Sequence, residues 1–341
     1  MTTPAHPAVR RQSPAGGDGI AHATRDIRAE LDRVEGQLED WSRSTNPLTA
    51  EVSRYVLRKK GKRLRPALVL LTSRLFRAAS EEDVFLGSLV ELIHTASLIH
   101  DDIVDKAETR RGAESVHRRW GANVTVLLGD YLYIKSIGLS LESRHDRIIK
   151  LLADVSARMI EGELDEYALG GDLGITEEQY FGVIEKKTAS LFAACCRIGA
   201  VLGGAAPEEE RSVAEFGRSL GLCFQVTDDL LDFTGSELSL GKPVLSDLAE
   251  GRVTLPLIRA LSADGRPHRE KLEGLVGRRD ISSAERSRLL EILTAIGALA
   301  YTEAKAREFT ERALASLAGF ADSGPRRALA ELARFVLDRT C

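Results

Sequence analysis

Two clusters of aspartates with the same spacing are the residues of this sequence best suited to chemistry. They are Asp101-Asp102-x-x-Asp105 and Asp228-Asp229-x-x-Asp232. On a helix, residues four positions apart lie on one face with Cβ atoms about 5–6 Å apart, so each cluster would hold like charges side by side. That arrangement is unfavourable without a cation beside it. Carboxylates with no cysteine or histidine grouping select hard cations, so the clusters predict sites for Mg²⁺ or Mn²⁺.

Basic residues accompany the aspartates. They occur in Gly61-Lys62-Arg63-Leu64-Arg65-Pro66, in Arg110-Arg111-Gly112 and at Lys242. Mg²⁺ usually keeps several waters and completes its coordination with substrate phosphates rather than with an all-protein cage. One such aspartate cluster alone would usually be a solvated helix face. Two clusters on apolar segments, each followed by cations, instead predict a site for two diphosphates bridged by metal ions.

Helices must position these residues. No proline lies between Pro66 and Pro207, and this stretch is rich in the helix formers Leu, Ala, Glu and Arg. Apolar residues recur at helical spacing, for example at Leu86, Leu89 and Ile93. The first cluster falls near a predicted helix C-terminus, where the macrodipole disfavours anions and a cation would be stabilising. The pattern predicts an all-α chain of about a dozen helices, some longer than 20 residues, in a large helical bundle around a central cavity.

The domain organisation is predicted to be simple. Residues 1–20 hold three of the ten prolines and three glycines, and this composition predicts a disordered tail. No break in composition divides residues 21–341, which we therefore interpret as one all-helical domain.

Composition excludes several classes of function. The 341 residues are 43% hydrophobic and 29% charged with a net charge of −4, so no general nucleic-acid surface is expected. No apolar run reaches the length of a membrane span and no signal-peptide core is present, so a cytoplasmic location is predicted. The cysteines have no metal-ligand or C-x-x-C spacing and are predicted to be reduced and without chemical function: Cys195, Cys196, Cys223 and Cys341.

In their order along the chain, the motifs resemble those of the trans-type isoprenyl diphosphate synthases, the polyprenyl synthetase family, over residues 30–340. Each motif is weak alone, but their joint order and spacing are specific. They are G-K-x-x-R-P at 61–66, D-D-x-x-D at 101–105, R-R-G at 110–112, Gly129-Asp130, Lys187-Thr188, Phe224-Gln225, D-D-x-x-D at 228–232, Gly241-Lys242 and D-L-x-x-G-x-x-T-L-P at 247–256.

The resemblance implies the isoprenoid synthase fold and a role for each matching residue. It implies that three Mg²⁺ ions hold an allylic diphosphate between Asp101, Asp102 and Asp105 on one side and Asp228 on the other. Asp229 and Asp232 would support the second cluster, partly through waters. The diphosphate of the allylic substrate would contact Arg110, Lys187 and Lys242. The diphosphate of isopentenyl diphosphate would contact Lys62, Arg65, His94 and Arg111. Thr188 and Gln225 would lie close to the reacting carbons.

One position departs from the family pattern. Arg252 stands where many members have lysine, in the segment before T-L-P. The charge is kept, whereas the contact geometry of a guanidinium differs from that of an ammonium.

The resemblance also bears on the product. The implied reaction ionises the allylic diphosphate, joins it to isopentenyl diphosphate and releases a proton. In this family, bulky aromatic residues four or five positions before the first cluster stop chain growth early. Those positions are the small residues Ser97 and Ala96, which favours a hexaprenyl to decaprenyl product over a farnesyl or geranylgeranyl one. The tunnel floor is expected one layer deeper, at Leu89, Leu92, Ile93 and Ile137.

Other functions fit less well. A terpene cyclase uses a different second metal motif, and head-to-head synthases of the squalene type are disfavoured similarly. A regulatory subunit of a hetero-oligomeric prenyl synthase typically lacks the aspartates, although a catalytic subunit that needs a partner stays open. The family implies a homodimer, with transient membrane contact for release of a lipid product.

Overall fold

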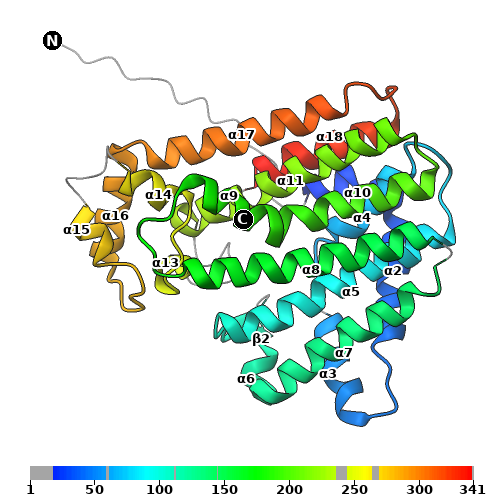
Figure 1. Cartoon of the computed structure of the whole chain (residues 1–341), viewed down its shortest axis with the longest axis horizontal. Helices are drawn as coiled ribbons and strands as arrows, with labels where there is room; N and C mark the ends of the chain where they lie inside the picture. Colours follow the sequence, from blue (N-terminus) through cyan, green and yellow to red (C-terminus); the bar gives the residue numbers. More distant parts are fainter. Residues whose placement is uncertain are drawn as a thin grey trace.

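The computed structural model of the chain is almost entirely helical (Figure 1). It describes residues 18–58, 61–110, 113–143, 145–235, 244–262 and 269–339.

The elements follow one another with short connections. The N-terminal half contains α1 (Asp18–Ala23), the 3-10 turn η1 (Arg25–Ile27), α2 (Arg28–Trp41), α3 (Pro47–Leu57), α4 (Leu64–Ser73), α5 (Glu81–Val104), β1 (Thr109–Arg110), β2 (Ala113–Glu114), α6 (Val116–Trp120), α7 (Ala122–Ser140) and α8 (Asp146–Leu169). The C-terminal half contains α9 (Glu177–Ile184), the π-helical turn η2 (Glu185–Ala189), α10 (Ser190–Gly203), α11 (Pro207–Thr234), α13 (Ser246–Ala249), α14 (Leu255–Leu261), α15 (Arg269–Glu273), α16 (Ser283–Ala295), α17 (Ala298–Ser316) and α18 (Gly324–Leu337).

The three longest helices are α5, α8 and α11. The sequence contains clear start signals for α5 and α11, and these two helices end at the aspartate clusters. Ser80 and Asp83 form a capping box at the start of α5, which satisfies backbone N–H groups that have no partner within the helix. Pro207 occupies the first turn of α11, where its missing N–H costs nothing. Both α5 and α11 end with an aspartate cluster, so the two clusters are carried on the C-terminal turns of long, rigid elements.

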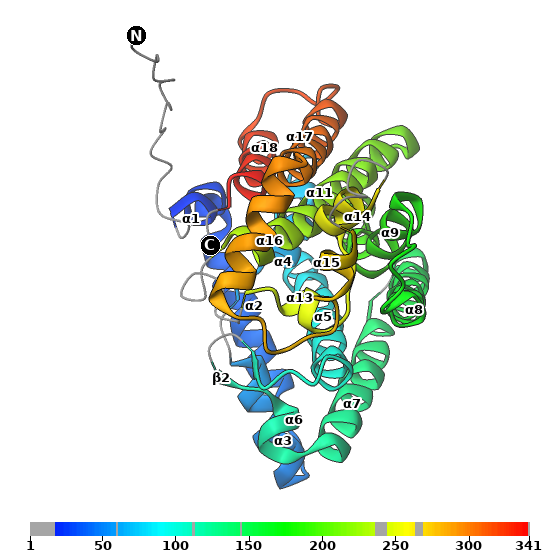
Figure 2. The same ribbon diagram turned by 90° about the vertical axis from the view of Figure 1, so that its left-hand side faces the viewer.

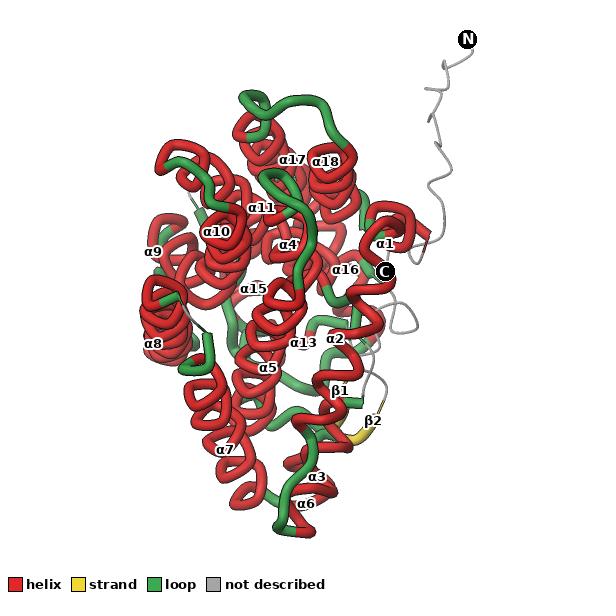
Figure 3. Tube along the Cα trace, turned by 90° about the vertical axis from the view of Figure 1, so that its right-hand side faces the viewer, coloured by secondary structure: helices red, strands yellow, loops and turns green. Residues whose placement is uncertain are grey.

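The helices pack in an order that brings distant parts of the sequence together. Helix α10 packs between α4 and α11, α4 packs on α5, and α5 packs on α7. Figure 3 shows α5 in the middle of the bundle with α8 and α7 on one side and α2 on the other. Apolar side chains of these helices, among them Phe192 and Phe216, form the main core.

A second, smaller core lies at the end of the bundle that faces the viewer in Figure 2, where α13, α14, α15 and α16 gather. Phe233, in the last turn of α11, is buried in it together with Leu257 and Leu293. This end of the molecule therefore packs directly behind the second aspartate cluster.

The all-α prediction is confirmed, with one addition. Strands β1 and β2 pair antiparallel over two residues each, in the connection that follows the first aspartate cluster. The described chain begins with α1 at Asp18, inside the segment predicted as a tail, and α1 packs on α18. Residues 1–17 lie outside the described residues.

Two further expectations can be compared with the described part of the chain. None of its helices has both the length and the apolar character needed to cross a bilayer. Cys195, Cys196 and Cys223 are free, as predicted, and they are buried, whereas Cys341 lies outside the described residues.

Candidate active site

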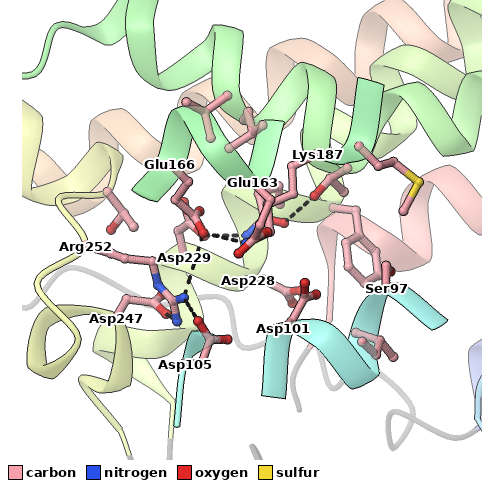
Figure 4. A pocket seen from close by; sticks show the side chains of 18 of the residues that line it. Ser97, Asp101, Asp105, Glu163, Glu166, Lys187, Asp228, Asp229, Asp247 and Arg252 are labelled. Carbon is pink, nitrogen blue, oxygen red and sulfur yellow. Dashed lines mark hydrogen bonds and ion pairs between the residues drawn. The ribbon is translucent and has the colours of Figure 1, made fainter. Parts of the chain in front are cut away.

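A cavity of about 950 Å³ lies between α5, α8, the α9–η2 segment, α11 and the segment 247–254. Four of the six predicted metal-binding aspartates line it: Asp101, Asp105, Asp228 and Asp229. Figure 4 shows these side chains approaching one another from opposite walls, with Lys187 and Arg252 among them. The fold therefore brings residues of both clusters to one cavity, although the clusters are far apart in the sequence.

Within the first cluster, only two of the three carboxylates reach the cavity. Asp101 and Asp105 line it, whereas Asp102 is buried beside it and accepts a hydrogen bond from Arg110 Nε at 2.6 Å. Neighbouring residues of a helix point about 100° apart, so Asp102 cannot share the face of the other two. Asp102 thus holds Arg110 beside the cavity and does not itself line the cavity as described.

The environment of Asp101 is strongly electronegative. Burial and the nearby Glu163 carboxylate raise the pKa of Asp101 to about 7. Glu163 and Glu166, one turn apart on α8, line the same cavity. A carboxylate held among other carboxylates in a partly buried site gains stability from any cation that enters.

Lys187 is a partly buried cation of this region. Its Nζ lies 2.6 Å from Glu163 and also pairs with Glu166. Although burial opposes it, the carboxylates of Glu166, Asp101 and Glu163 raise the pKa of Lys187. Lys187 belongs to η2, and single π-helical turns inside helices often occur at functional sites.

Gly162 allows α8 to approach η2 closely. A Cβ at this position would lie 2.5 Å from the backbone nitrogen of Lys187, a distance that no side chain could occupy. The glycine thereby brings Glu163 against Lys187.

In the second cluster, each aspartate has a different partner. Asp228 is partly exposed, at 42% of its side chain, and pairs with Arg339, which follows α18. Asp229 is buried and accepts hydrogen bonds from the Tyr180 hydroxyl at 2.6 Å and from Gln225 Nε2 at 2.8 Å. Burial and the Asp247 carboxylate raise the pKa of Asp229, while Tyr180 and Gln225 oppose that increase.

Asp232 does not line the cavity as described, and its side chain caps the short helix α13. Its carboxylate accepts hydrogen bonds from the Ser246 backbone N–H at 3.2 Å, the Ser246 hydroxyl at 2.8 Å and the Asp247 N–H at 3.2 Å. A side-chain acceptor at a helix N-terminus satisfies N–H groups that the helix leaves unpaired. Asp232 therefore holds the segment that carries Asp247 and Arg252.

Arg252 joins the two halves of the site. Its guanidinium donates to Asp105 at 2.8 Å and to Asp247 at 3.0 Å, and it also pairs with Glu250 and lies 3.9 Å from Glu166. Despite burial, these carboxylates raise the pKa of Arg252. The planar guanidinium can satisfy several carboxylates at once, which a lysine ammonium does less well.

Three of the four predicted isopentenyl diphosphate residues, all except Arg111, lie together at the other end of the cavity. Lys62, Arg65 and His94 line both the main cavity and an adjoining one of about 550 Å³, and Arg339 lies with them. Arg65 stacks on Phe192, with 4.9 Å between the guanidinium carbon and the ring centroid.

Arg63, which directly precedes α4, anchors the chain between Lys62 and Arg65. The buried Arg63 side chain forms ion pairs with Glu35 and Glu91, both at 2.6 Å. Its backbone is left-handed, with φ of 47°, an unfavourable conformation for a side-chain-bearing residue that these ion pairs hold in place. Of the remaining predicted diphosphate ligands, Arg111 and Lys242 lie outside the described residues.

The Gly129-Asp130 motif packs against the turn before the first cluster. A Cβ on Gly129 would lie 2.2 Å from His100 Nε2, so the glycine provides the space for this ring. His100 Nε2 also lies 3.3 Å from an Asp130 carboxylate oxygen, and its ring stacks on Tyr133. This motif therefore packs α7 against the α5 turn that carries Asp101.

The residues expected to limit chain length divide into two groups. Ser97 lines the cavity, whereas Ala96 is completely buried and does not line the cavity as the structure describes it. The floor prediction is wrong for Ile137, which is 54% exposed on α7. Leu89, Leu92 and Ile93 are core residues of α5. The apolar cavity wall beside Ser97 instead contains Leu98, Tyr133, Met159 and Ile160.

Several residues that line the cavity were not predicted from the sequence. Glu163 and Glu166 are three residues apart, which places them on one helix face, and Glu163 directly follows a glycine. This pattern is a weak signal in the sequence. Tyr180 and Arg339 belong to no recognisable motif, and their places in the site depend on helix packing alone.

Comparisons with known proteins agree with this geometry. The polyprenyl synthetase family model matches residues 46–293. A short chain isoprenyl diphosphate synthase of Methanothermobacter thermautotrophicus is 37% identical over 291 residues, covering 84% of this chain and 89% of that protein. An octaprenyl diphosphate synthase of Escherichia coli is 34% identical, covering 86% and 90%. A crystal structure of a polyprenyl synthase from Caulobacter crescentus, complexed with calcium and isoprenyl diphosphate, has a TM-score of 0.89 and 34% identity, covering 94% and 98%.

Proposed function

The chain belongs to the polyprenyl synthetase family and is a prenyltransferase, and we propose that it condenses isopentenyl diphosphate with an allylic diphosphate in the cavity between α5, α8 and α11. The observation that carries this proposal is the convergence of Asp101, Asp105 and Asp228 on one cavity that also contains Lys187. Carboxylates beside basic groups suit a diphosphate bound together with hard cations. The apolar wall next to them suits an isoprenoid chain.

The donor set fits Mg²⁺. Asp101, Asp105 and Asp228 offer only carboxylate oxygens, and we assign these three as direct ligands. The carboxylates of Asp102 and Asp232 are engaged by Arg110 and by the start of α13, which supports an indirect role for both. The expected three ions would complete their coordination with waters and substrate oxygens, as Mg²⁺ prefers. When bound, Mg²⁺ neutralises the charge that grows on the departing diphosphate.

The basic residues divide between the two substrates. Lys187 and Arg110 line the cavity beside Asp101 and are assigned to the allylic diphosphate. Lys62, Arg65 and His94 surround the adjoining cavity and are assigned to the diphosphate of isopentenyl diphosphate. Charged donors that are already oriented before substrate arrives bind phosphate oxygens without further reorganisation.

The reaction follows from these positions. The bond between the first allylic carbon and the diphosphate oxygen breaks, and its electron pair leaves with the diphosphate. The terminal double bond of isopentenyl diphosphate, held close by Lys62, Arg65 and His94, supplies the pair that forms the new carbon–carbon bond. The neighbouring carbon then loses a proton, which the released diphosphate accepts, and a new allylic double bond results.

We further propose a hexaprenyl to decaprenyl product. Small Ser97 leaves the cavity open beside Leu98 and Met159, which supports growth past the position where an aromatic residue would stop it. A farnesyl or geranylgeranyl product is the alternative, and relatives of both short and long product length share this fold.

A homodimer is proposed on the basis of one exposed apolar face. Most of the large apolar side chains that are exposed in the described chain lie on helices α7 and α8 or directly after α7: Val126, Leu127, Ile134, Ile137, Leu141, Ile160, Leu164 and Tyr167. A patch of this kind on a single chain favours association, and a second copy supplies a matching face.

The direct test is incubation of the purified protein with isopentenyl diphosphate, Mg²⁺ and geranyl, farnesyl or geranylgeranyl diphosphate in turn, followed by analysis of product length. We expect elongation to long-chain products. Products that stop at farnesyl or geranylgeranyl would favour the short-chain alternative. Elongation in a native extract but not by the purified protein would indicate a required partner subunit, and no elongation in either would overturn the proposal.

A further inference from the structure

Two cations that line the adjoining cavity lie over phenylalanine rings. The Lys62 ammonium nitrogen is 5.8 Å from the centroid of the Phe335 ring. The guanidinium carbon of Arg65 is 4.9 Å from the centroid of the Phe192 ring. Both basic side chains line the cavity of about 550 Å³ that is assigned to the diphosphate of isopentenyl diphosphate, and Phe335 lines it as well. Each of these two cations therefore has an aromatic face among its neighbours.

The Phe192 ring is fixed by the core of the bundle. It is completely buried on α10, which packs between α4 and α11. It also contacts the Phe224 ring of α11, with 5.3 Å between the two centroids. Phe224 in turn carries a further cation of the same cavity, since the guanidinium carbon of Arg339 lies 4.1 Å from its centroid. Arg65 and Arg339 thus lie on two rings that contact each other, and the position of one ring limits that of the other.

The Phe335 ring is fixed by the N-terminal helix α1. A Cβ added to Gly19 would lie 2.4 Å from Phe335 Cδ2, so the missing side chain lets α1 lie directly against the ring. The next residue of α1, Ile20, lines the adjoining cavity together with Phe335. Packing of α1 on α18 thereby sets the ring that Lys62 meets.

A ring face can hold a cation in place without neutralising it. The negative face of the aromatic quadrupole attracts an ammonium or a guanidinium, and the full positive charge is kept for an anion that binds later. The gain is greatest for lysine, whose charge sits at the end of a flexible four-carbon stem. A cation that is already in position when the substrate arrives loses less conformational entropy on binding it.

We propose that Phe335 and Phe192 are positioning residues for binding of isopentenyl diphosphate, because their ring faces hold the Lys62 ammonium and the Arg65 guanidinium at the wall of the adjoining cavity. The proposal rests on the proposed function, which assigns these two cations to that diphosphate. The rings act through the cations, so their removal should weaken binding of isopentenyl diphosphate and leave the allylic diphosphate and the chemical steps unaffected.

The test is steady-state kinetics with each substrate varied in turn. Phe335→Leu keeps an apolar side chain and removes the ring, and we expect KM for isopentenyl diphosphate to rise about threefold, since Lys62 is exposed. Phe192→Leu should raise it about tenfold, because the contact with Arg65 is shorter and the ring is buried. In both variants kcat and KM for the allylic substrate should stay within about twofold of the wild type. Phe335→Tyr keeps a ring and should retain the wild-type KM.

A matched control is available in the same chain. Arg312 lies over the ring of Phe309 at 5.7 Å, nearly the separation of Lys62 and Phe335, but neither residue lines either cavity as described. Phe309→Leu should leave both KM values unchanged. In a Lys62→Met background, Phe335→Leu should produce no further rise in KM for isopentenyl diphosphate, because its effect acts through the ammonium.

An unchanged KM for isopentenyl diphosphate in Phe335→Leu, or an equal rise in the KM values of both substrates, would overturn the positioning role. It would also be overturned if Phe335→Tyr behaved like Phe335→Leu, or if Phe335→Leu still raised KM in the Lys62→Met background. Phe335→Leu decides the proposal even if thermal unfolding shows that Phe192→Leu, a core variant, is unfolded. Failure of the proposed function has a different signature: the wild-type protein would then elongate no primer and would bind no isopentenyl diphosphate in calorimetry.

Discussion

The guanidinium of Arg339 donates to the carboxylate of Asp228, and it stacks on Phe224 with 4.1 Å between the guanidinium carbon and the ring centroid. Arg339 also lines the smaller cavity with Lys62 and Arg65. A side chain that follows the last helix thus lies between the two assigned diphosphate sites and pairs with an assigned metal ligand. Metal binding at Asp228 must compete with this guanidinium.

Replacing Arg339 should therefore change metal affinity. For Arg339→Gln we expect Mg²⁺, titrated without substrate, to bind about fivefold more tightly, since a partly exposed ion pair of roughly 1 kcal/mol no longer has to be broken. Calorimetric titration measures this directly. Arg334→Gln, at an exposed position of α18, is the control and should leave the affinity unchanged. Unchanged or weaker binding in Arg339→Gln would contradict the competition.

The first aspartate cluster should respond unequally to substitution. Asp101 lines the cavity, whereas Asp102 pairs with Arg110. We expect Asp101→Asn to lower kcat roughly a thousandfold, as for loss of a group that holds transition-state charge. Asp102→Asn should lower it only about tenfold, through a displaced Arg110. Steady-state kinetics at saturating Mg²⁺ decides this, and equal losses in the two variants would show that the helix face does not separate their roles.

Asp232 is expected to act on stability more than on metal binding. Asp232→Asn weakens the cap of α13 and leaves a buried N–H facing an amide donor, at a cost of about 1–3 kcal/mol. Chemical unfolding should show this loss, while the Mg²⁺ concentration for half-maximal activity stays the same. A large rise in that concentration would mean instead that Asp232 is a metal ligand.

Product length should depend on Ser97 rather than on Ala96. Ser97→Phe places a ring in the cavity and should shorten the products while elongation continues. Ala96→Phe inserts the ring into a closed core, where overpacking typically costs about 1–3 kcal/mol, so its main effect should be on thermal stability. Chromatography of the products and thermal unfolding separate the two outcomes. Unchanged product length in Ser97→Phe would show that this wall does not hold the growing chain.

The apolar face of α7 and α8 should be required for self-association. Ile137→Asp puts a charge into this face, and we expect it to convert a dimer into monomers in sedimentation experiments. Leu48→Asp, at a comparably exposed leucine of α3, is the control and should leave the association state unchanged. A wild-type protein that sediments as a monomer, or an Ile137→Asp variant that stays dimeric, would exclude this face as the dimer contact.

Much of the fold could be predicted because the local signals are strong and agree with one another. The 140-residue stretch without proline and the helical spacing of its apolar residues both correspond to observed helices. Boundaries were less certain: α1 begins inside the predicted tail, because packing of α1 on α18 stabilises it although its own sequence does not. Short helices depend on such tertiary contacts.

For the candidate active site as well, some features could be predicted from the sequence and others depend on helix packing. Residue type and spacing alone indicated carboxylates for hard cations and basic groups for diphosphates, because these chemical preferences belong to the side chains themselves. Spacing could not decide that Asp102 and Asp232 do not line the cavity as described, or that Ala96 is sealed in the core while Ser97 is open. Those outcomes depend on which face each helix presents after packing, and one residue turns that face by about 100°. Likewise Tyr180, Glu163 and Arg339 reached Asp229, Lys187 and Asp228 only through contacts between segments far apart in the sequence, which tertiary structure alone brings together.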